Sequence, residues 1–239
     1  MILAKDLSKE FEGHPALKCV NLEVEKGETM VIMGRSGCGK SVLLKLIIGL
    51  LKPDGGQIWV DGKEITDLTE KQMDEVRKKF GMVFQSSALF DSLTVGENVG
   101  FSLPRHTSMG REQIAQVVAE KLDLVGLHGV EDAMPADLSG GMKKRVSLAR
   151  AISMDPEIIL YDEPTTGLDP VMAEEINLLI ARLHDRLEVT SLVVTHDMKS
   201  AFSVATRMAM MYDGKIIATG TPEEFRQSTE PAVRQFLNT

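Results

Sequence analysis

A glycine-rich stretch near the start of the chain has the residue types and spacing of a phosphate-binding loop. Residues 34–41 read GRSGCGKS, which fits the pattern G-x-x-x-x-G-K-[S/T] at every fixed position. Glycines let backbone N–H groups approach phosphate oxygens closely, and a helix that begins at the loop adds positive potential. Lys40 can then reach the β- and γ-phosphates of a nucleotide, and the Ser41 hydroxyl can bind Mg²⁺.

The alternative is a glycine-rich turn with an incidental lysine. It leaves unexplained why an apolar run precedes the loop and a helical pattern follows it. We therefore expect phosphate contacts along the whole loop, in which Cys38 fills a variable position. The loop residues are Gly34, Arg35, Ser36, Gly37, Cys38, Gly39, Lys40 and Ser41.

Two adjacent acids end a second apolar run, ILYDEP at residues 159–164. A carboxylate at the carboxyl end of a central strand can face the metal bound to the phosphates, and Asp162 is the candidate. Glu163, one residue further on, can take a proton from the attacking water if it is held within hydrogen-bond reach. A surface Asp-Glu pair is the alternative, but the apolar residues before it favour the strand-end interpretation.

Two further polar residues follow expected strands. His196 comes after SLVVT (191–195), where a contact with the γ-phosphate competes with a plain surface position. Gln85 comes after KFGMVF (79–84), and its amide could contact Mg²⁺ or the nucleophilic water. On its own the glutamine is a weak signal.

A second anion site is indicated by LSGGMKKRVSLARA, residues 138–151. The Ser139 hydroxyl and the N–H groups of Gly140 and Gly141 lie at the N-terminus of an expected helix, where an oxyanion is stabilised. The basic residues that follow are expected to be mainly solvated helix positions. They are Lys143, Lys144, Arg145 and Arg150.

These residues need an α/β scaffold to position them. Apolar runs with a strand pattern alternate with helical patterns, which predicts a mostly parallel central sheet, preceded by an antiparallel β portion and interrupted by an inserted helical subdomain. We expect one domain over 1–239. Its core is 1–85 with 156–225, its helical subdomain is 86–155, and its C-terminal tail is 226–239. The expected strands are 17–24, 29–33, 79–84, 157–161 and 191–195, the hairpins 57–65 and 207–218, and the helices 41–51, 111–125, 138–153 and 170–187.

The composition limits the function classes. The chain has 239 residues, 43% of them hydrophobic, and a net charge of −8, which argues against a nucleic-acid binder. Cys19 and Cys38 give neither a disulfide framework nor a metal-binding spacing. No apolar run is long enough to cross a membrane, so any membrane role is expected to require a partner.

Taken in order, GRSGCGKS, Gln85, LSGGM, ILYDEP, Gly167-Leu168-Asp169 and His196 resemble the nucleotide-binding subunit of ABC transporters, over essentially the whole chain. The resemblance implies ATP and Mg²⁺ as ligands. It also implies a homodimer, in which the signature of one copy closes on ATP held by the other. Asp169 resembles the residue that crosses this interface. Phe11 resembles the aromatic residue that stacks on adenine, although a core role would also suit it.

A narrower resemblance concerns the ATPases of Mla/Mce-associated lipid transporters. It rests on Met142, which replaces the usual glutamine of the signature, and on residues 84–106 and 231–237. It implies a phospholipid or other hydrophobic cargo, a multispan permease, an Mce-domain lipid-binding protein and, in some systems, a STAS-domain partner. The chain would then be peripheral, on the cytoplasmic side of the inner membrane.

Three alternatives remain open from the sequence. An importer for a polar solute would use the same ATPase chemistry with a periplasmic solute-binding partner. A soluble ABC ATPase, such as a cluster-assembly subunit, would bind soluble scaffold proteins. A P-loop kinase of a small metabolite would leave LSGG and His196 unexplained.

Overall fold

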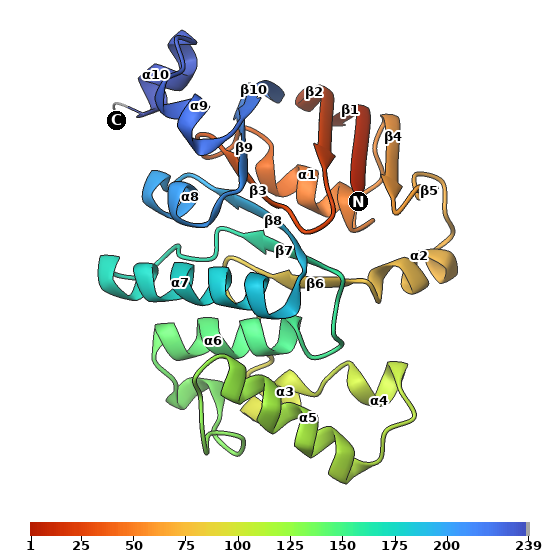
Figure 1. Cartoon of the computed structure of the whole chain (residues 1–239). Helices are drawn as coiled ribbons and strands as arrows, with labels where there is room; N and C mark the ends of the chain where they lie inside the picture. The colour runs from red at the N-terminus through yellow and green to blue at the C-terminus, as the bar shows by residue number, and fades with distance from the viewer. Residues whose placement is uncertain (238–239) are drawn as a thin grey trace.

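A mostly parallel six-stranded sheet forms the centre of the molecule, and the computed structural model describes residues 1–237 (Figure 1). The strand order is β10-β9-β3-β8-β7-β6, and every neighbouring pair is parallel except the antiparallel pair β9 and β10. All residues of β3, β7 and β8 are buried, as expected for strands covered on both faces. The strands are β3 (Thr29–Met33), β6 (Phe80–Val83), β7 (Ile158–Asp162), β8 (Thr190–Thr195), β9 (Arg207–Tyr212) and β10 (Lys215–Gly220).

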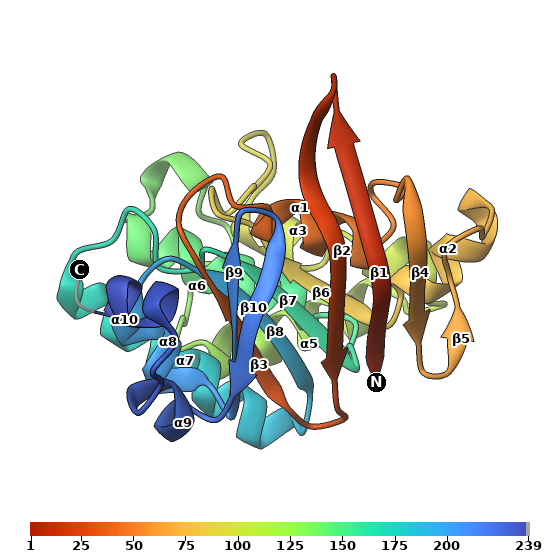
Figure 2. The same cartoon turned by 90° about the horizontal axis from the view of Figure 1, so that it is seen from above.

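A smaller antiparallel sheet is built from the N-terminal part of the chain, in the order β2-β1-β4-β5. Ile2 in β1 pairs with Val24 on one side and with Val60 on the other. The hairpin of β1 and β2 extends well beyond the rest of the molecule (Figure 2). The strands are β1 (Ile2–Phe11), β2 (His14–Val24), β4 (Gly55–Val60) and β5 (Lys63–Glu64).

Alternation along the central strands divides the core into two halves. Val31 and Met33 of β3 face one hydrophobic cluster, and Met30 and Ile32 face the other. The second cluster also takes in the antiparallel sheet and α1 (Lys40–Ile47). The first cluster includes side chains of α7 (Pro170–Leu187) and of the helices between β6 and β7. The phosphate loop and the helical region therefore lie over opposite halves of one core.

Between β6 and β7 the chain forms only helices, which gather at one end of the molecule (Figure 1). They pack on the sheet through α6, so the segment shares its core with the sheet rather than having one of its own. The boundaries 86 and 155 of a helical subdomain stay a prediction. The helices are α3 (Val95–Val99), α4 (Leu103–His106), α5 (Arg111–Leu124), the 3-10 turn η1 (Pro135–Asp137) and α6 (Gly140–Ala151).

The predicted fold class is confirmed. Of the remaining helices, α8 (Met198–Val204) packs on the central strands β3 and β8, whereas α2 (Glu70–Arg77) contacts the edge strand β6 and α9 (Pro222–Arg226) contacts β9 and β10. The helix expected over 170–187 has these bounds, whereas the one expected over 41–51 ends at Ile47. Of the expected tail 226–239, residues 238 and 239 lie outside the described range. Within residues 1–237, no helix is both long and apolar enough to cross a bilayer. The helix that follows α9 is α10 (Pro231–Leu237).

Candidate nucleotide-binding site

The phosphate loop connects the end of β3 to the start of α1, the context that the motif requires. Two of its glycines are required by close backbone approach. A Cβ atom at Gly34 would lie 2.3 Å from the Met211 carbonyl oxygen, and one at Gly39 would lie 2.6 Å from that of Ala16. Gly39 also has φ of 109°, which favours glycine. The loop conformation therefore follows from the residues that the motif specifies.

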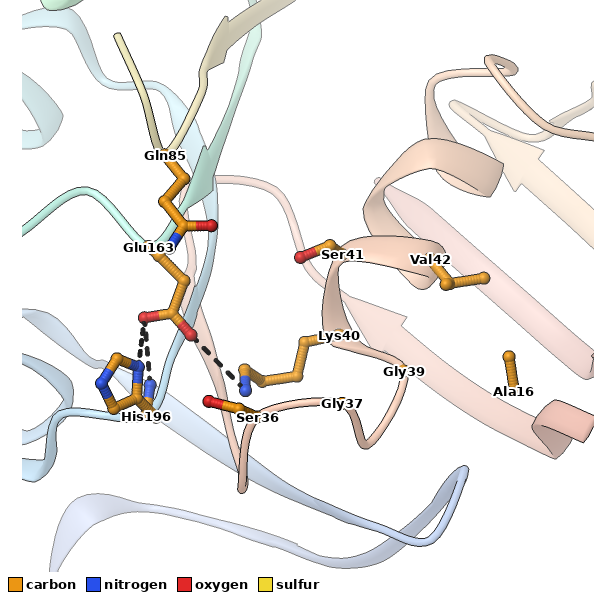
Figure 3. Close-up of a pocket in the computed structure, with 10 residues that line it drawn as sticks. All are labelled: Ala16, Ser36, Gly37, Gly39, Lys40, Ser41, Val42, Gln85, Glu163 and His196. Carbon is orange, nitrogen blue, oxygen red and sulfur yellow. Dashed lines mark hydrogen bonds and ion pairs between the residues drawn. The ribbon is translucent and has the colours of Figure 1, made fainter. Parts of the chain in front are cut away.

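Lys40 is held inside this loop. Its side chain is 5% exposed, and Nζ donates hydrogen bonds to the carbonyl oxygens of Gly34 at 2.7 Å and Arg35 at 3.1 Å. Nζ also lies 3.5 Å from Oε1 of Glu163 (Figure 3). A buried ammonium group beside a helix N-terminus gives the loop two sources of positive potential for an anion.

Ser41 and Asp162 link α1 to the end of β7. The Ser41 hydroxyl donates to Asp162 Oδ1 at 2.8 Å. Burial raises the pKa of the Asp162 carboxyl, because desolvation disfavours its charged form, and the nearby Glu163 carboxylate acts in the same direction. The Ser41 hydrogen bond only partly opposes this shift. Asp162 is thus a desolvated carboxylate beside a hydroxyl, a pair suited to a hard cation such as Mg²⁺.

Glu163 has a strained backbone and a carboxylate fixed on both sides. Its φ is 49°, in the left-handed region, and its N–H donates to the Val194 carbonyl oxygen at 2.9 Å. Oε2 contacts Nδ1 of His196 at 2.8 Å and accepts from the His196 backbone N–H at 3.3 Å. The carboxylate therefore lies between Lys40 and His196, as Figure 3 shows.

An open cleft of about 320 Å³ brings together residues of the phosphate loop with Gln85, Glu163 and His196. Gln85 is among them, and it lies on the same side of the cleft as Glu163 (Figure 3). Ala16 of β2 also lines the cleft, and nothing in its residue type could have indicated this from the sequence. The lining residues are Ala16, Ser36, Gly37, Gly39, Lys40, Ser41, Val42, Gln85, Glu163 and His196.

Five predicted residues of the nucleotide site do not line this cleft, namely Phe11, Gly34, Arg35, Cys38 and Asp162. Arg35 contributes its carbonyl oxygen to Lys40, and burial raises the pKa of the half-buried Cys38 thiol. Phe11 ends β1 near the tip of the projecting hairpin and is 43% exposed, with Lys9 Nζ 5.5 Å from its ring centroid. Its exposure excludes the alternative of a core phenylalanine, while adenine stacking stays a prediction.

The signature residues lie apart from the cleft, at the N-terminus of α6. The Ser139 hydroxyl caps this helix by accepting from the Met142 N–H at 3.3 Å. Gly140 packs next to Leu168, in the loop that leads to α7. Asp169 caps α7 by accepting from the N–H groups of Val171 and Met172. The signature and the loop 167–169 thus lie side by side, and neither contributes a residue to the lining of the cleft.

The expectation that the basic residues of α6 are solvated was wrong for Lys144. Its side chain is 5% exposed, and Nζ donates to the Gln85 carbonyl oxygen at 2.5 Å. Arg145 and Arg150 are partly buried, and both donate to backbone carbonyl oxygens. These contacts could not be predicted from the sequence, because the acceptors lie twenty or more positions away.

A phosphate loop on a mostly parallel sheet, with a carboxylate pair at the end of a neighbouring strand, is the arrangement of P-loop nucleotide-binding proteins. The family model "ABC transporter" matches residues 17–166. The chain belongs to the ABC transporter family, and it is an ATP-binding ATPase of that family.

Two curated relatives match most of the chain. The intermembrane phospholipid transport system ATP-binding protein MlaF of Haemophilus influenzae is 47% identical over 91% of this chain and 83% of its own. The probable ribonucleotide transport ATP-binding protein mkl of Mycobacterium leprae is 43% identical over 99% of this chain and 68% of its own.

The fold has a close counterpart among solved structures. A dimeric ATP-binding cassette in a post-hydrolysis state, bound to ADP and Pi, superposes with a TM-score of 0.85. It is 35% identical in sequence, over 93% of this chain and 99% of the cassette.

Proposed function

We propose that this ATPase powers the transport of lipid, specifically phospholipid, across or between bacterial envelope membranes through a separate multispan permease. The similarity to the phospholipid-transport protein MlaF, over nine-tenths of the chain, supports the cargo class. The chain then works as a peripheral subunit on the cytoplasmic side of the inner membrane. An Mce-domain lipid-binding protein and a STAS-domain protein are the further partners that this assignment suggests.

One observation carries the mechanism: the signature surface and the phosphate cleft lie apart on the same chain. In a head-to-tail homodimer, Ser139, Gly140 and Gly141 of one copy complete the cleft of the other, and Asp169 lies at the interface. Two identical chains thus form two composite sites. The similar cassette that is dimeric with ADP and Pi supports this arrangement.

Residues 1–237 hold no cluster of three or more His, Cys, Asp or Glu side chains suited to a metal ion. In this proposal the phosphates of ATP would hold Mg²⁺ together with Ser41, Asp162 and Gln85 on the protein side. The Ser41–Asp162 pair fits this role, because hydroxyl and carboxylate oxygens are the ligands that the ion prefers. When bound, Mg²⁺ neutralises charge on the β- and γ-phosphates.

The hydrolysis step is carried by the residues around Glu163. Lys40 leaves its ion pair with Glu163 to bind the phosphates, and Phe11 stacks on adenine. Glu163 takes a proton from water as the water oxygen bonds to the γ-phosphorus and the bond to ADP breaks. His196 orients the carboxylate through Nδ1, which leaves Nε2 for the γ-phosphate. Loss of that phosphate removes the contacts that bridge the dimer, so the dimer opens.

The permease is expected to dock on the helical region, 86–155, near Phe90 and Phe101. These two rings pack against each other, with centroids 4.6 Å apart. Beside them is a mostly apolar cleft of about 590 Å³, formed by residues of α3, α4 and α5. Charged residues of both signs line this cleft, the acids Glu97, Glu131 and Asp132 with the bases Arg105 and Arg111. A permease helix that docks there can therefore place its apolar face in the cleft and pair charges around it.

A pull-down of the tagged chain from its native cell in mild detergent tests the cargo and the partners. Mass spectrometry of proteins and lipids should recover a multispan permease, an Mce-domain protein and enriched phospholipid. A permease with a solute-binding protein would contradict the lipid assignment and support the polar-solute alternative, which the relative named for ribonucleotide transport favours. Recovery of soluble proteins only would overturn the transport role and support the alternative of a cluster-assembly ATPase.

A further inference from the structure

The segment after β6, residues 85–88, has a backbone conformation that is unfavourable unless other parts of the protein stabilise it. Gln85 is exposed, and Ser87 and Ala88 have φ of 62° and 46°, in the left-handed region. Two successive non-glycine residues in that region are unfavourable and persist only where surrounding structure imposes them. The proposed role of Gln85 at Mg²⁺ or the attacking water nevertheless requires a defined position of this residue in the cleft.

Two basic residues of α6 hold this segment through its carbonyl oxygens. Lys144 Nζ donates to Gln85 O at 2.5 Å. Arg150 donates through Nη2 to Ser87 O at 2.9 Å and through Nη1 to Ala88 O at 2.7 Å. Three carbonyl groups near one turn are thus bound by two cations, and charged donors make the stronger kind of hydrogen bond.

The segment is also fixed at its far end. The fully buried Asn98 side chain accepts from the Phe90 N–H at 2.8 Å and donates to the carbonyl oxygens of Phe90, Leu93 and Thr94. Residues beyond Phe90 are therefore held by α3. Within residues 1–237, the one side-chain hydrogen bond to Gln85 comes from Lys144, so the position of Gln85 depends on α6.

We propose that Lys144, supported by Arg150, is a positioning residue that sets the place of Gln85 in the nucleotide site. This inference rests on the proposed role of Gln85 at Mg²⁺ or the attacking water. The same helix begins at the signature, which in the proposed dimer contacts the ATP of the opposite copy. Lys144 therefore ties the glutamine of one site to the signature of the other.

A second explanation for the burial of Lys144 must be separated from this one. Burial lowers the pKa of the Lys144 ammonium, and the nearby carboxylates of Asp162 and Glu163 partly oppose that shift. Lys144 could thus act on those carboxylates by charge alone. If it did, its effect on hydrolysis would not depend on the Gln85 side chain.

A double-mutant cycle distinguishes the two explanations. In the unaltered chain, Lys144→Met should lower kcat by about tenfold, with the KM for ATP changed by less than about twofold, because the P-loop is intact. In a Gln85→Ala background the same substitution should cost less than about twofold. Lys144→Arg, which keeps a charged donor, should recover part of kcat. Equal losses in both backgrounds would overturn the proposal.

Lys121→Met is the matched control. Lys121 of α5 is equally buried, at 5% exposure, but its Nζ binds Asp155 at 2.6 Å, away from Gln85. It should change thermal stability without lowering kcat per folded molecule. If Lys144→Met does not fold, the same cycle with Arg150→Met, at a partly exposed residue, distinguishes the two explanations.

If Gln85→Ala keeps full kcat, the positioning role of Lys144 is excluded. ATPase activity of the unaltered chain would still support the proposed function in that case.

Discussion

At the scale of single residues, Glu163 is the most constrained group in the site. A left-handed backbone, an ion pair with Lys40 and two contacts with His196 all fix one carboxylate at the cleft. Glu163→Gln keeps the shape and the ability to accept from the His196 N–H, but it removes the proton acceptor. We expect kcat to fall by at least about a hundredfold while the Kd for ATP stays within a few fold. A steady-state ATPase assay with nucleotide-binding titration measures both, and a variant that retains most of the rate would exclude Glu163 as the base.

Burial of the Asp162 carboxylate lowers the free energy of unfolding, and this effect can be measured as a function of pH. Burial raises the pKa of its carboxyl above the ordinary 3.8, so the native state binds the proton more tightly than the unfolded state does. The penalty is absent at pH values below 3.8 and appears as pH rises through the native pKa. Asp162→Asn should therefore raise the melting temperature at neutral pH, with a gain that disappears at acidic pH. A constant gain at all pH values would contradict this explanation.

At the scale of elements, α6 joins two regions that lie far apart in the sequence, the signature and the segment that begins at Gln85. Its N-terminus carries the signature, and its buried face carries Lys144 under the segment that begins at Gln85. Because desolvation lowers the pKa of Lys144, its charge costs stability at all pH values well below the ordinary 10.5. Since the carbonyl of the exposed Gln85 can bind water instead, Lys144→Met should leave the melting temperature at neutral pH unchanged or higher. A large decrease would assign Lys144 a mainly structural role.

The elements also show what could be predicted from the sequence. The phosphate loop and the acids after β7 are local patterns, each next to an apolar run, so they could be identified without a structure. The helix 170–187 starts at Asp169-Pro170, a cap followed by a residue suited to the first turn, and its predicted bounds agree with the structure. The burial of Lys144 could not be predicted, because it depends on a contact with a residue 59 positions away. The same reason explains why Ala16 was missed at the cleft.

At the scale of the whole molecule, the separation of cleft and signature makes a prediction about mixed dimers. Lys40→Ala should disable the phosphate loop. Gly140→Asp should disable the signature by placing a carboxylate against phosphate, and the fold should tolerate it. A Cβ at Gly140 has only an ordinary contact with Leu168, at 3.7 Å, and an acid in the first turn of α6 favours that helix. Each variant alone should therefore be folded and inactive as an ATPase.

Mixing the two variants separates a composite site from a site within one chain. In a head-to-tail heterodimer both substitutions fall in the same site, and the other site combines an intact loop with an intact signature. A heterodimer isolated through two different tags should recover about half of the unaltered ATPase rate if its sites turn over independently. If loop and signature served the same nucleotide within one chain, each copy would carry one defect and the heterodimer would stay inactive. Recovery would therefore show that two chains build each site, whereas its absence, for sites that turn over independently, would return the signature to its own chain.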